Sequence, residues 1–218
     1  MSDAARSAEF IRQLPERVLQ HTMERIPAGR QAAVLLPLIP AEGKPAAEWD
    51  VLLEVRSRSI VQGGEICFPG GGRMDNETCS ECAVRETSEE LLIDREQISV
   101  AASLFNTAGP RGTEVFSYLG VLQNYHDTWS HDEVDHILRL PLSYFLRVQP
   151  EIHEGELVTR VGEDFPYDQI PGGKGYRFWS IPKTYYFYPT KHGAIWGLTA
   201  AILHAAAELF MEDAGTGY

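Results

Sequence analysis

The segment that most constrains the fold is a helix with a well-defined start, placed directly after a glycine-rich loop. The spacing of apolar residues predicts this helix over about Thr78 to Leu91. Thr78 can cap its first turn, and Glu81 three residues later completes a capping box. The side chains expected to face the core are Ala83, Val84, Thr87 and Leu91. The chain must therefore bury one face of this helix against other elements.

The adjoining face of the same helix is acidic. At about 100° per residue, Glu90 lies about 40° from Glu86, and Glu89 lies about 60° to the other side, so three carboxylates share one face. Like charges at this spacing destabilise an isolated helix by a few tenths of a kcal/mol per pair, so an offsetting partner is expected. Oxygen ligands on one rigid element suit Mg²⁺ or Mn²⁺, and Arg85 can orient one carboxylate. A merely solvated acidic face is the alternative, but the glycine loop before the helix favours a metal site.

Strand patterns lie on both sides of this helix. The apolar run Ala32–Ile39 is typical of a buried strand, and Trp49–Val55 is its expected hairpin partner. Further strands are predicted at Ile98–Phe105, Glu114–Leu122, Val134–Leu140 and Tyr176–Tyr188. The polar stretch Glu151–Gly175 is expected to be a long loop or a hairpin arm. Strands before and after a central helix indicate a mixed α/β sandwich.

Two further helices are predicted near the ends of the chain. Residues from Ala4 to about Met23 have helical spacing, with a break or kink at Pro15. A last helix is expected from about Ala194 to Met211. Its predicted core stripe is Ile195, Thr199, Ile202, Ala206 and Leu209. We therefore divide the chain into an N-terminal helical extension, residues 1–30, and one compact domain, residues 31–218.

The composition argues against several classes of protein. The chain has 218 residues, with 19 Lys and Arg against 31 Asp and Glu, which gives a formal net charge of −12. Binding to nucleic-acid phosphates needs a positively charged surface, and this chain is acidic, so no nucleic-acid partner is expected. No apolar run approaches the roughly 18 residues that span a bilayer, so no membrane partner is expected. Three cysteines cannot all pair, and no secretory segment precedes them, which favours a cytoplasmic location.

The loop and the acidic helix together resemble a known motif. Gly71 is followed after five residues by Glu77, and after seven more by the run Arg85–Ile93. This arrangement closely resembles the Nudix box: a glycine, a spaced glutamate, Arg-Glu, an aliphatic residue, any residue, Glu-Glu, any residue, glycine and an aliphatic residue. Thr87 stands where an aliphatic residue is usual, and Leu92 stands where the glycine is usual.

Membership of the Nudix family implies an α/β/α sandwich with a mixed β-sheet. It also implies hydrolysis of a nucleoside diphosphate linked to another moiety, by water activated at a divalent metal. Carried over to this sequence, Glu86 and Glu90 would be the main ligands of Mg²⁺ or Mn²⁺. Glu89 would be a further ligand or a base, and the carbonyl of Gly71 would complete the coordination sphere.

The same resemblance implies supporting residues. Glu77 and Arg85 would hold the loop and the helix together. A carboxylate outside the motif often assists catalysis in this family, and Glu133 and Glu114 are candidates for that role, although each can also be a surface carboxylate.

Two segments before the helix resemble the signature of coenzyme A pyrophosphatases. That signature reads Leu-Leu-Thr-x-Arg-Ser-Ala, a spacer, then glycine, three residues and Phe-Pro-Gly-Gly. Leu52–Arg58 matches its first part, with Glu54 in place of the threonine and Arg58 in place of the alanine, and Gly64–Gly71 matches its second part. The resemblance implies coenzyme A or a derivative as substrate, with 3′,5′-ADP and 4′-phosphopantetheine as products.

An anionic substrate of this kind needs local cations in an acidic protein. Arg56 and Arg58 lie just before the glycine loop and are the expected substrate-binding cations, together with the backbone of Gly70 and Gly71. The aromatic run Tyr185–Tyr188 can stack adenine, but an aromatic strand is more often part of a core.

Two alternatives to a coenzyme A diphosphatase stay open at this level. One is hydrolysis of another nucleoside diphosphate derivative, such as ADP-ribose or NADH. The other is a Nudix fold that binds nucleotide as a regulator without turnover, against which the intact Glu86, Glu89 and Glu90 argue. The sequence does not choose between a monomer and a homodimer.

Overall fold

The structure of the protein, a computed structural model, describes residues 29–40, 49–109 and 112–215. The predicted N-terminal helix therefore lies outside the described residues. The strands of the main sheet are β1 (Gln31–Pro40), β2 (Trp49–Arg56), β3 (Ile66–Cys67), β4 (Gly70–Gly72), β5 (Ile98–Ala108), β6 (Glu114–Leu122) and β7 (Val134–Pro141). The helices are α2 (Cys79–Leu91), α3 (Leu142–Arg147) and α4 (Gly197–Gly215), with short 3₁₀ turns at Arg95–Gln97, Tyr167–Gln169 and Gly173–Gly175.

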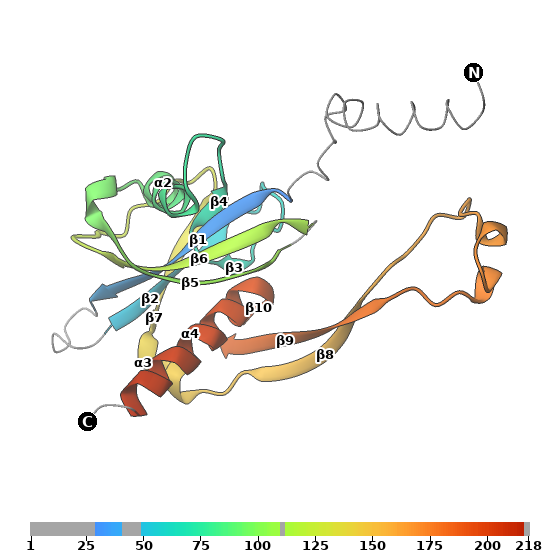
Figure 1. Ribbon diagram of the computed structural model, residues 1–218. Helices are drawn as coiled ribbons and strands as arrows, with labels where there is room; N and C mark the ends of the chain where they lie inside the picture. The colour runs from blue at the N-terminus through green and yellow to red at the C-terminus, as the bar shows by residue number, and fades with distance from the viewer. Residues whose placement is uncertain (1–28, 41–48, 110–111, 216–218) are drawn as a thin grey trace, which may run out of the picture.

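The central element is a seven-stranded mixed sheet with the order β3-β2-β1-β6-β5, in which β4 also pairs with β1 and β7 with β2 (Figure 1). Strands β1 and β6 are parallel, with Gln31 paired with Glu114 and Leu38 with Val121, and the remaining pairs are antiparallel. The predicted hairpin of the first two strands is confirmed, because Leu38 pairs with Val51 and Pro40 with Trp49.

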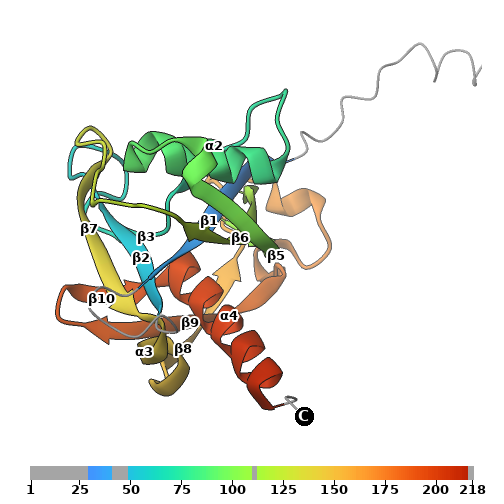
Figure 2. The same ribbon diagram turned by 90° about the vertical axis from the view of Figure 1, so that its left-hand side faces the viewer.

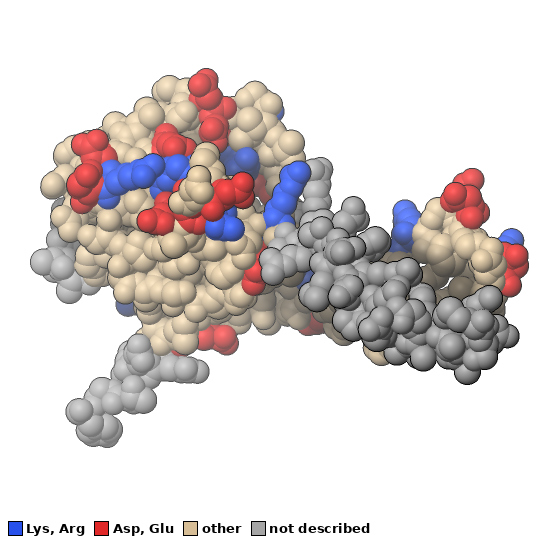
Figure 3. Space-filling model, turned by 45° about the horizontal axis from the view of Figure 1, so that its top comes forward, with Lys and Arg blue, Asp and Glu red and all other residues tan. Residues whose placement is uncertain are grey.

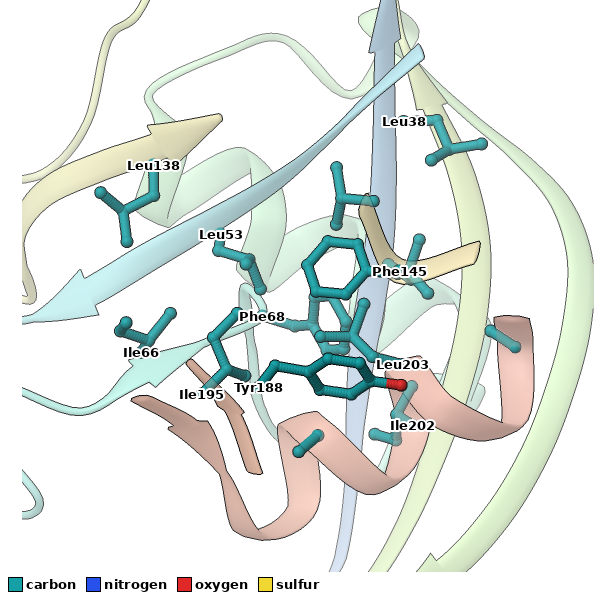
Figure 4. Packing of buried hydrophobic residues seen from close by; sticks show 14 of the residues in the cluster. Leu38, Leu53, Ile66, Phe68, Leu138, Phe145, Tyr188, Ile195, Ile202 and Leu203 are labelled. Atoms are coloured by element: carbon teal, nitrogen blue, oxygen red, sulfur yellow. The ribbon is translucent and has the colours of Figure 1, made fainter. Parts of the chain in front are cut away.

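Helices cover both faces of this sheet (Figure 2). Side chains of β1 alternate between the two faces, so Leu35 packs with α2 while Leu36 packs with α4. On β2, Leu52 likewise packs on the α2 side and Leu53 on the α4 side. Figure 4 shows the hydrophobic core on the α4 side of the sheet, where Phe68 and Leu53 lie near Leu203 of α4. The predicted α/β/α sandwich with a mixed sheet is thus confirmed.

A second, three-stranded sheet lies beside α4, with the order β10-β9-β8. Its strands are β8 (Glu151–Val158), β9 (Ser180–Thr190) and β10 (Gly193–Trp196). Strands β8 and β9 form a long hairpin that projects from the body of the molecule, with short 3₁₀ turns near its tip (Figure 1). The prediction of a hairpin arm is confirmed, although β9 begins at Ser180 rather than at Tyr176.

The predicted start of the last helix is wrong. Residues Gly193–Trp196 form strand β10, which pairs with β9, and α4 begins only at Gly197. Ile195 is fully buried as expected, but from a strand, where it pairs with Tyr188. Leu209 is 45% exposed and does not belong to the core stripe. Gly197 has φ +63°, a left-handed conformation that allows the abrupt change from strand to helix. Among the described helices, none is long and apolar enough to cross a membrane.

Candidate active site

Helix α2 begins as its sequence predicts. The hydroxyl of Thr78 accepts a hydrogen bond from the backbone N–H of Glu81 at 3.2 Å, and the Glu81 carboxylate accepts one from the Thr78 N–H at 2.8 Å. Three of the four residues predicted to face the core, Ala83, Thr87 and Leu91, are fully buried on the side of α2 that packs on β1 and β2, and Val84 is half-buried at its edge. This cap and this buried side fix which residues of α2 face the glycine loop.

The two departures from the Nudix pattern are accommodated locally. The Thr87 hydroxyl donates to the carbonyl of Ala83 at 2.7 Å, which satisfies its polarity inside the core. Leu92 ends the helix with φ +53° and ψ +48°, the left-handed conformation that favours glycine. Both departures therefore lie in the packing or the end of the helix, away from its acidic face.

The glycine loop lies directly against the acidic face of α2. The Gly70 N–H donates to Glu90 Oε2 at 2.8 Å. A Cβ atom added at Gly71 would lie 2.5 Å from the Glu86 carboxyl group, and one added at Gly70 would lie 2.3 Å from the backbone oxygen of Ala33. Glycines are therefore required at these positions for β4 to approach both β1 and the carboxylates.

Arg85 joins the loop to the helix. Its Nε donates to Glu77 Oε2 at 2.9 Å and its Nη2 to Glu77 Oε1 at 2.7 Å, a bidentate pair. Its Nη1 donates to Glu86 at 2.8 Å and to Glu89 at 3.1 Å, and its Nη2 also donates to the Gly72 carbonyl at 3.1 Å. The hydrogen bonds from Arg85 lower the pKa of Glu77 to about 2, and the same contacts raise the pKa of Arg85. On the α2 side of the molecule, acidic and basic side chains accordingly gather close together (Figure 3).

The deepest part of the site is a pair of buried carboxyl groups, Glu54 and Glu90. Glu90 is 3% exposed and Glu54 is 1% exposed. Burial raises the pKa of both groups, and repulsion between them and from Glu86 and Glu133 raises them further. The pKa of Glu86 is raised mainly by its own burial. Without a cation these carboxyl groups therefore hold their protons more readily than exposed ones, because water screens their charges poorly.

Sequence reasoning missed Glu54 as a member of the site. Its Oε1 accepts a hydrogen bond from the Cys67 thiol at 3.3 Å, and its Oε2 has no partner among the described residues. The signal was present in the alternation of β2, because Leu52 packs on the α2 side and Glu54 two residues later points to the same side. In the sequence alone, Glu54 stands out only as a departure from the threonine of the coenzyme A signature.

The other predicted carboxylates, Glu133, Glu114 and Glu89, differ in how close they lie to this buried pair. Glu133 lies close enough to the cluster to raise the pKa of Glu54, Glu86 and Glu90. Glu114 instead accepts hydrogen bonds from Gln31 and Asn106, and it is not among the groups that raise the pKa of Glu54, Glu86 or Glu90. Glu89 lies at the rim, 59% exposed, and contacts Arg85.

A cavity of about 410 Å³ adjoins this cluster. Gly70, whose N–H binds Glu90, lines it, and so does Arg56 at the end of β2. Arg58 is exposed in the following loop and does not line the cavity. Of the two predicted substrate-binding arginines, the structure therefore places only Arg56 beside the cluster.

The chemistry of these residues fits a hard divalent cation. Within the described parts of the chain, no group of three or more acidic, histidine or cysteine side chains is already arranged to hold a metal ion. Instead, Arg85 binds Glu86 and Glu89, and the Gly70 N–H binds Glu90. All the donors are nevertheless oxygens, and the unpartnered Glu54 Oε2 lies among repelling carboxyl groups. A cation would offset that charge, and oxygen donors suit Mg²⁺ or Mn²⁺.

The family profile of the NUDIX domain matches residues 29–170, a range that holds the glycine loop, α2 and Glu54. The chain belongs to the Nudix family. It is a Nudix hydrolase, an enzyme that cleaves acid anhydride bonds between phosphoryl groups. Nudix hydrolases generally use divalent metals, and nucleoside diphosphate derivatives are their typical substrates.

This Nudix hydrolase is similar to both uncharacterized and characterised members of the family. The uncharacterized Nudix hydrolase NudL of Citrobacter koseri is 31% identical over 182 residues, which cover 82% of this chain and 81% of that protein. The peroxisomal coenzyme A diphosphatase NUDT7 of Mus musculus is 32% identical over 136 residues, which cover 61% of this chain and 55% of that protein. The crystal structure of RenU, a Nudix hydrolase from M. smegmatis, is 25% identical, with a TM-score of 0.44 over 52% of this chain and 71% of that one.

The contact between Gly71 and Glu86 gives a first prediction. Gly71→Ala places a methyl group against the Glu86 carboxyl, which is the flexible end of a side chain and can move away. We expect the free energy of unfolding to change by less than about 1 kcal/mol, and hydrolysis to fall about 100-fold because the carboxylate is displaced. Thermal unfolding and a phosphatase-coupled assay measure the two effects. Gly72→Ala is the matched control, since nothing lies within 4 Å of its added Cβ, and equal activity of the two variants would contradict the prediction.

Proposed function

We propose that this Nudix hydrolase cleaves the diphosphate bond of coenzyme A or its derivatives to 3′,5′-ADP and 4′-phosphopantetheine. The observation that carries the proposal is the position of Gly70, which binds Glu90 through its N–H and also lines the cavity that contains Arg56. A diphosphate beside Gly70 would thus lie between the acidic cluster and a cation. The match to the coenzyme A signature and the name of the mouse relative support this substrate class.

In the proposed site, Glu86 and Glu90 would be the main ligands of Mg²⁺ or Mn²⁺, with the Gly71 carbonyl and Glu89 as further donors. A cation bound there supplies charge neutralisation at the diphosphate and lowers the pKa of a bound water. Arg85 fixes the direction of Glu86 and Glu89 through Nη1, and the Gly70 N–H fixes that of Glu90. Glu54 and Glu133 add negative charge behind these ligands, which favours a divalent cation over a monovalent one.

Arg56 would bind the substrate rather than the metal. It is half-buried at the end of β2, and its Nε donates to the Val61 carbonyl at 3.3 Å, which holds the side chain at the cavity. In a chain with a net charge of −12, such a cation offers an anionic diphosphate a local positive charge. Arg58 is exposed and would act at most at the outer edge of the site.

The proposal is tested by product analysis. The purified protein is incubated with coenzyme A, ADP-ribose and NADH, each with Mg²⁺, Mn²⁺ or EDTA, and products are separated by chromatography. We expect 3′,5′-ADP to form fastest from coenzyme A, only with a divalent cation, and not to form with EDTA. Faster release of AMP from ADP-ribose or NADH would keep the Nudix chemistry and overturn the coenzyme A specificity. Binding of these nucleotides without any turnover would instead support a regulator.

A further inference from the structure

Strand β9 divides its aromatic residues between the core and the cavity. Tyr188 and Tyr186 point to the core side. The Tyr188 ring lies 5.3 Å from that of Phe145, and the Tyr186 ring lies 4.3 Å from that of His204 on α4, both measured between centroids. Because strand side chains alternate, the residues between and before them face the opposite side. Only half of the aromatic run is therefore used in the core.

The opposite side of β9 lines the cavity beside the acidic cluster. Tyr185 and Lys183 lie on this side and line the cavity, and Trp196 of β10 lines it too. Phe187 stacks on Trp196, with ring centroids 5.9 Å apart and an interplanar angle of 13°, which holds the indole in one plane. Trp196 is nevertheless 42% exposed. A fixed aromatic ring with free surface is suited to stack on an aromatic ligand.

Lys183 gives the same wall a positive charge. Its ammonium group lies 5.9 Å from the centre of the Tyr185 ring. Within the described ranges it forms no ion pair with a carboxylate, including Glu65 of the same cavity. Because Lys183 is half-buried and has no anionic partner among the described residues, its ammonium group is available to an anionic group of a ligand.

We infer that Lys183, Tyr185 and Trp196 form a subsite for a nucleobase and the phosphate monoester attached to its ribose. The two aromatic rings would bind the base, and the Lys183 ammonium would bind the monoester. The inference rests on the proposed function, which places the scissile diphosphate on the Gly70 side of the same cavity. A volume of about 410 Å³ lies within the roughly 300–1,000 Å³ of small-molecule sites.

This subsite lies outside the part of the chain that the family profile covers. The match to the NUDIX domain ends at residue 170, and all three residues follow it on β9 and β10. The diphosphate chemistry thus belongs to the matched domain, while recognition of the base and its phosphate would come from β9 and β10, which follow it.

Binding of two nucleotides that carry no diphosphate tests the subsite without turnover. Isothermal titration calorimetry with Mg²⁺ compares adenosine 3′,5′-bisphosphate with AMP. We expect the wild type to bind the bisphosphate about 10-fold more tightly. Lys183→Gln should abolish that difference and leave the affinity for AMP unchanged. Trp196→Ala should weaken both nucleotides about 10-fold, and Trp196→Phe should restore binding.

Matched controls come from the projecting hairpin. Trp179 is 86% exposed and Lys174 is exposed near the tip, and neither lines this cavity. Trp179→Ala and Lys174→Gln should bind both nucleotides as the wild type does. Thermal unfolding of each variant shows whether a loss of binding comes from misfolding.

The outcomes separate the subsite from the proposed function. Equal affinity of the wild type for the two nucleotides, or unchanged binding by Lys183→Gln and Trp196→Ala, overturns the subsite even if coenzyme A is hydrolysed. The expected binding pattern without hydrolysis of coenzyme A supports the subsite and overturns the proposed substrate. Absence of both binding and hydrolysis overturns both.

Discussion

Glu90→Gln is expected to reduce diphosphate hydrolysis by about 10³-fold or more and to raise the melting temperature of the metal-free protein. The first effect follows from the proposed role of Glu90 as a main cation ligand. Charge stabilisation by a bound metal is worth several kcal/mol, and each 1.4 kcal/mol is about tenfold in rate. The second effect follows from burial, because glutamine keeps an oxygen for the Gly70 N–H and removes a charge that Glu54 and Glu86 repel.

The gain in stability should depend on pH in a defined direction. Burial and nearby carboxylates raise the pKa of Glu90 in the folded chain above its ordinary value of 4.5. Below that value the carboxyl is protonated in both the folded and the unfolded chain, so the variant and the wild type differ little. As pH rises, the unfolded carboxyl ionises first and the wild type loses stability. The variant should therefore be more stable by roughly 1–2 kcal/mol at pH 8, and by little at pH 4.

Thermal unfolding in EDTA at both pH values, together with an assay in Mg²⁺, measures these effects. Glu89→Gln is the stability control, because Glu89 lies at the rim and its removal should leave the melting temperature in EDTA near that of the wild type. A Glu90→Gln variant that is less stable in EDTA would show that its charge is favourable in the metal-free fold. A variant that keeps its activity would remove Glu90 from the ligand set.

The features that the sequence predicts correctly are those set by neighbours along the chain. The capping box of α2 depends on Thr78 and Glu81, which are three residues apart. The contact between Glu77 and Arg85 is implied by the Nudix resemblance, which is read along one segment, although the bidentate partner of Arg85 is Glu77 rather than a carboxylate of the acidic face. The first hairpin follows from two apolar runs with turn residues between them. In each case the decisive contacts lie in or next to one continuous segment.

The features that it does not predict depend on contacts between distant segments. Ile195 and Trp196 have the spacing of a helix with the residues that follow, yet they form a strand because β9 offers free backbone groups for pairing. Glu54 has the local pattern of a strand residue, and only the packing of α2 on β2 brings it beside Glu90. The alternation of β2 shows which side Glu54 faces, but no local pattern shows what lies there.

Glu77→Gln is expected to lower the free energy of unfolding at pH 7 by about 3 kcal/mol, because it takes the bidentate partner from a buried guanidinium. For a chain of this size, such a loss lowers the melting temperature by about 6–12 °C. Arg85 keeps its contacts with Glu86, Glu89 and the Gly72 carbonyl, so we expect the fold to survive the substitution.

The loss should disappear in acid. Hydrogen bonds from Arg85 lower the pKa of Glu77 from its ordinary value of 4.5 to about 2. A lowered pKa gives stability that is fully present above pH 4.5 and is lost as pH falls towards 2. Melting temperatures of the two proteins at pH 7, 4 and 3 should therefore converge as pH falls. Glu163→Gln, on an exposed residue of the hairpin, should follow the wild type at every pH.

A difference between Glu77→Gln and the wild type that stays constant from pH 7 to pH 3 would contradict an electrostatic origin. It would mean that Glu77 stabilises the loop through packing rather than through its charge, since an amide oxygen can also accept the hydrogen bond from the Met74 N–H. Convergence in acid would instead show that the charge pair of Glu77 and Arg85 holds the glycine loop against α2. That contact also positions Gly71 against Glu86, so activity should fall with stability at neutral pH.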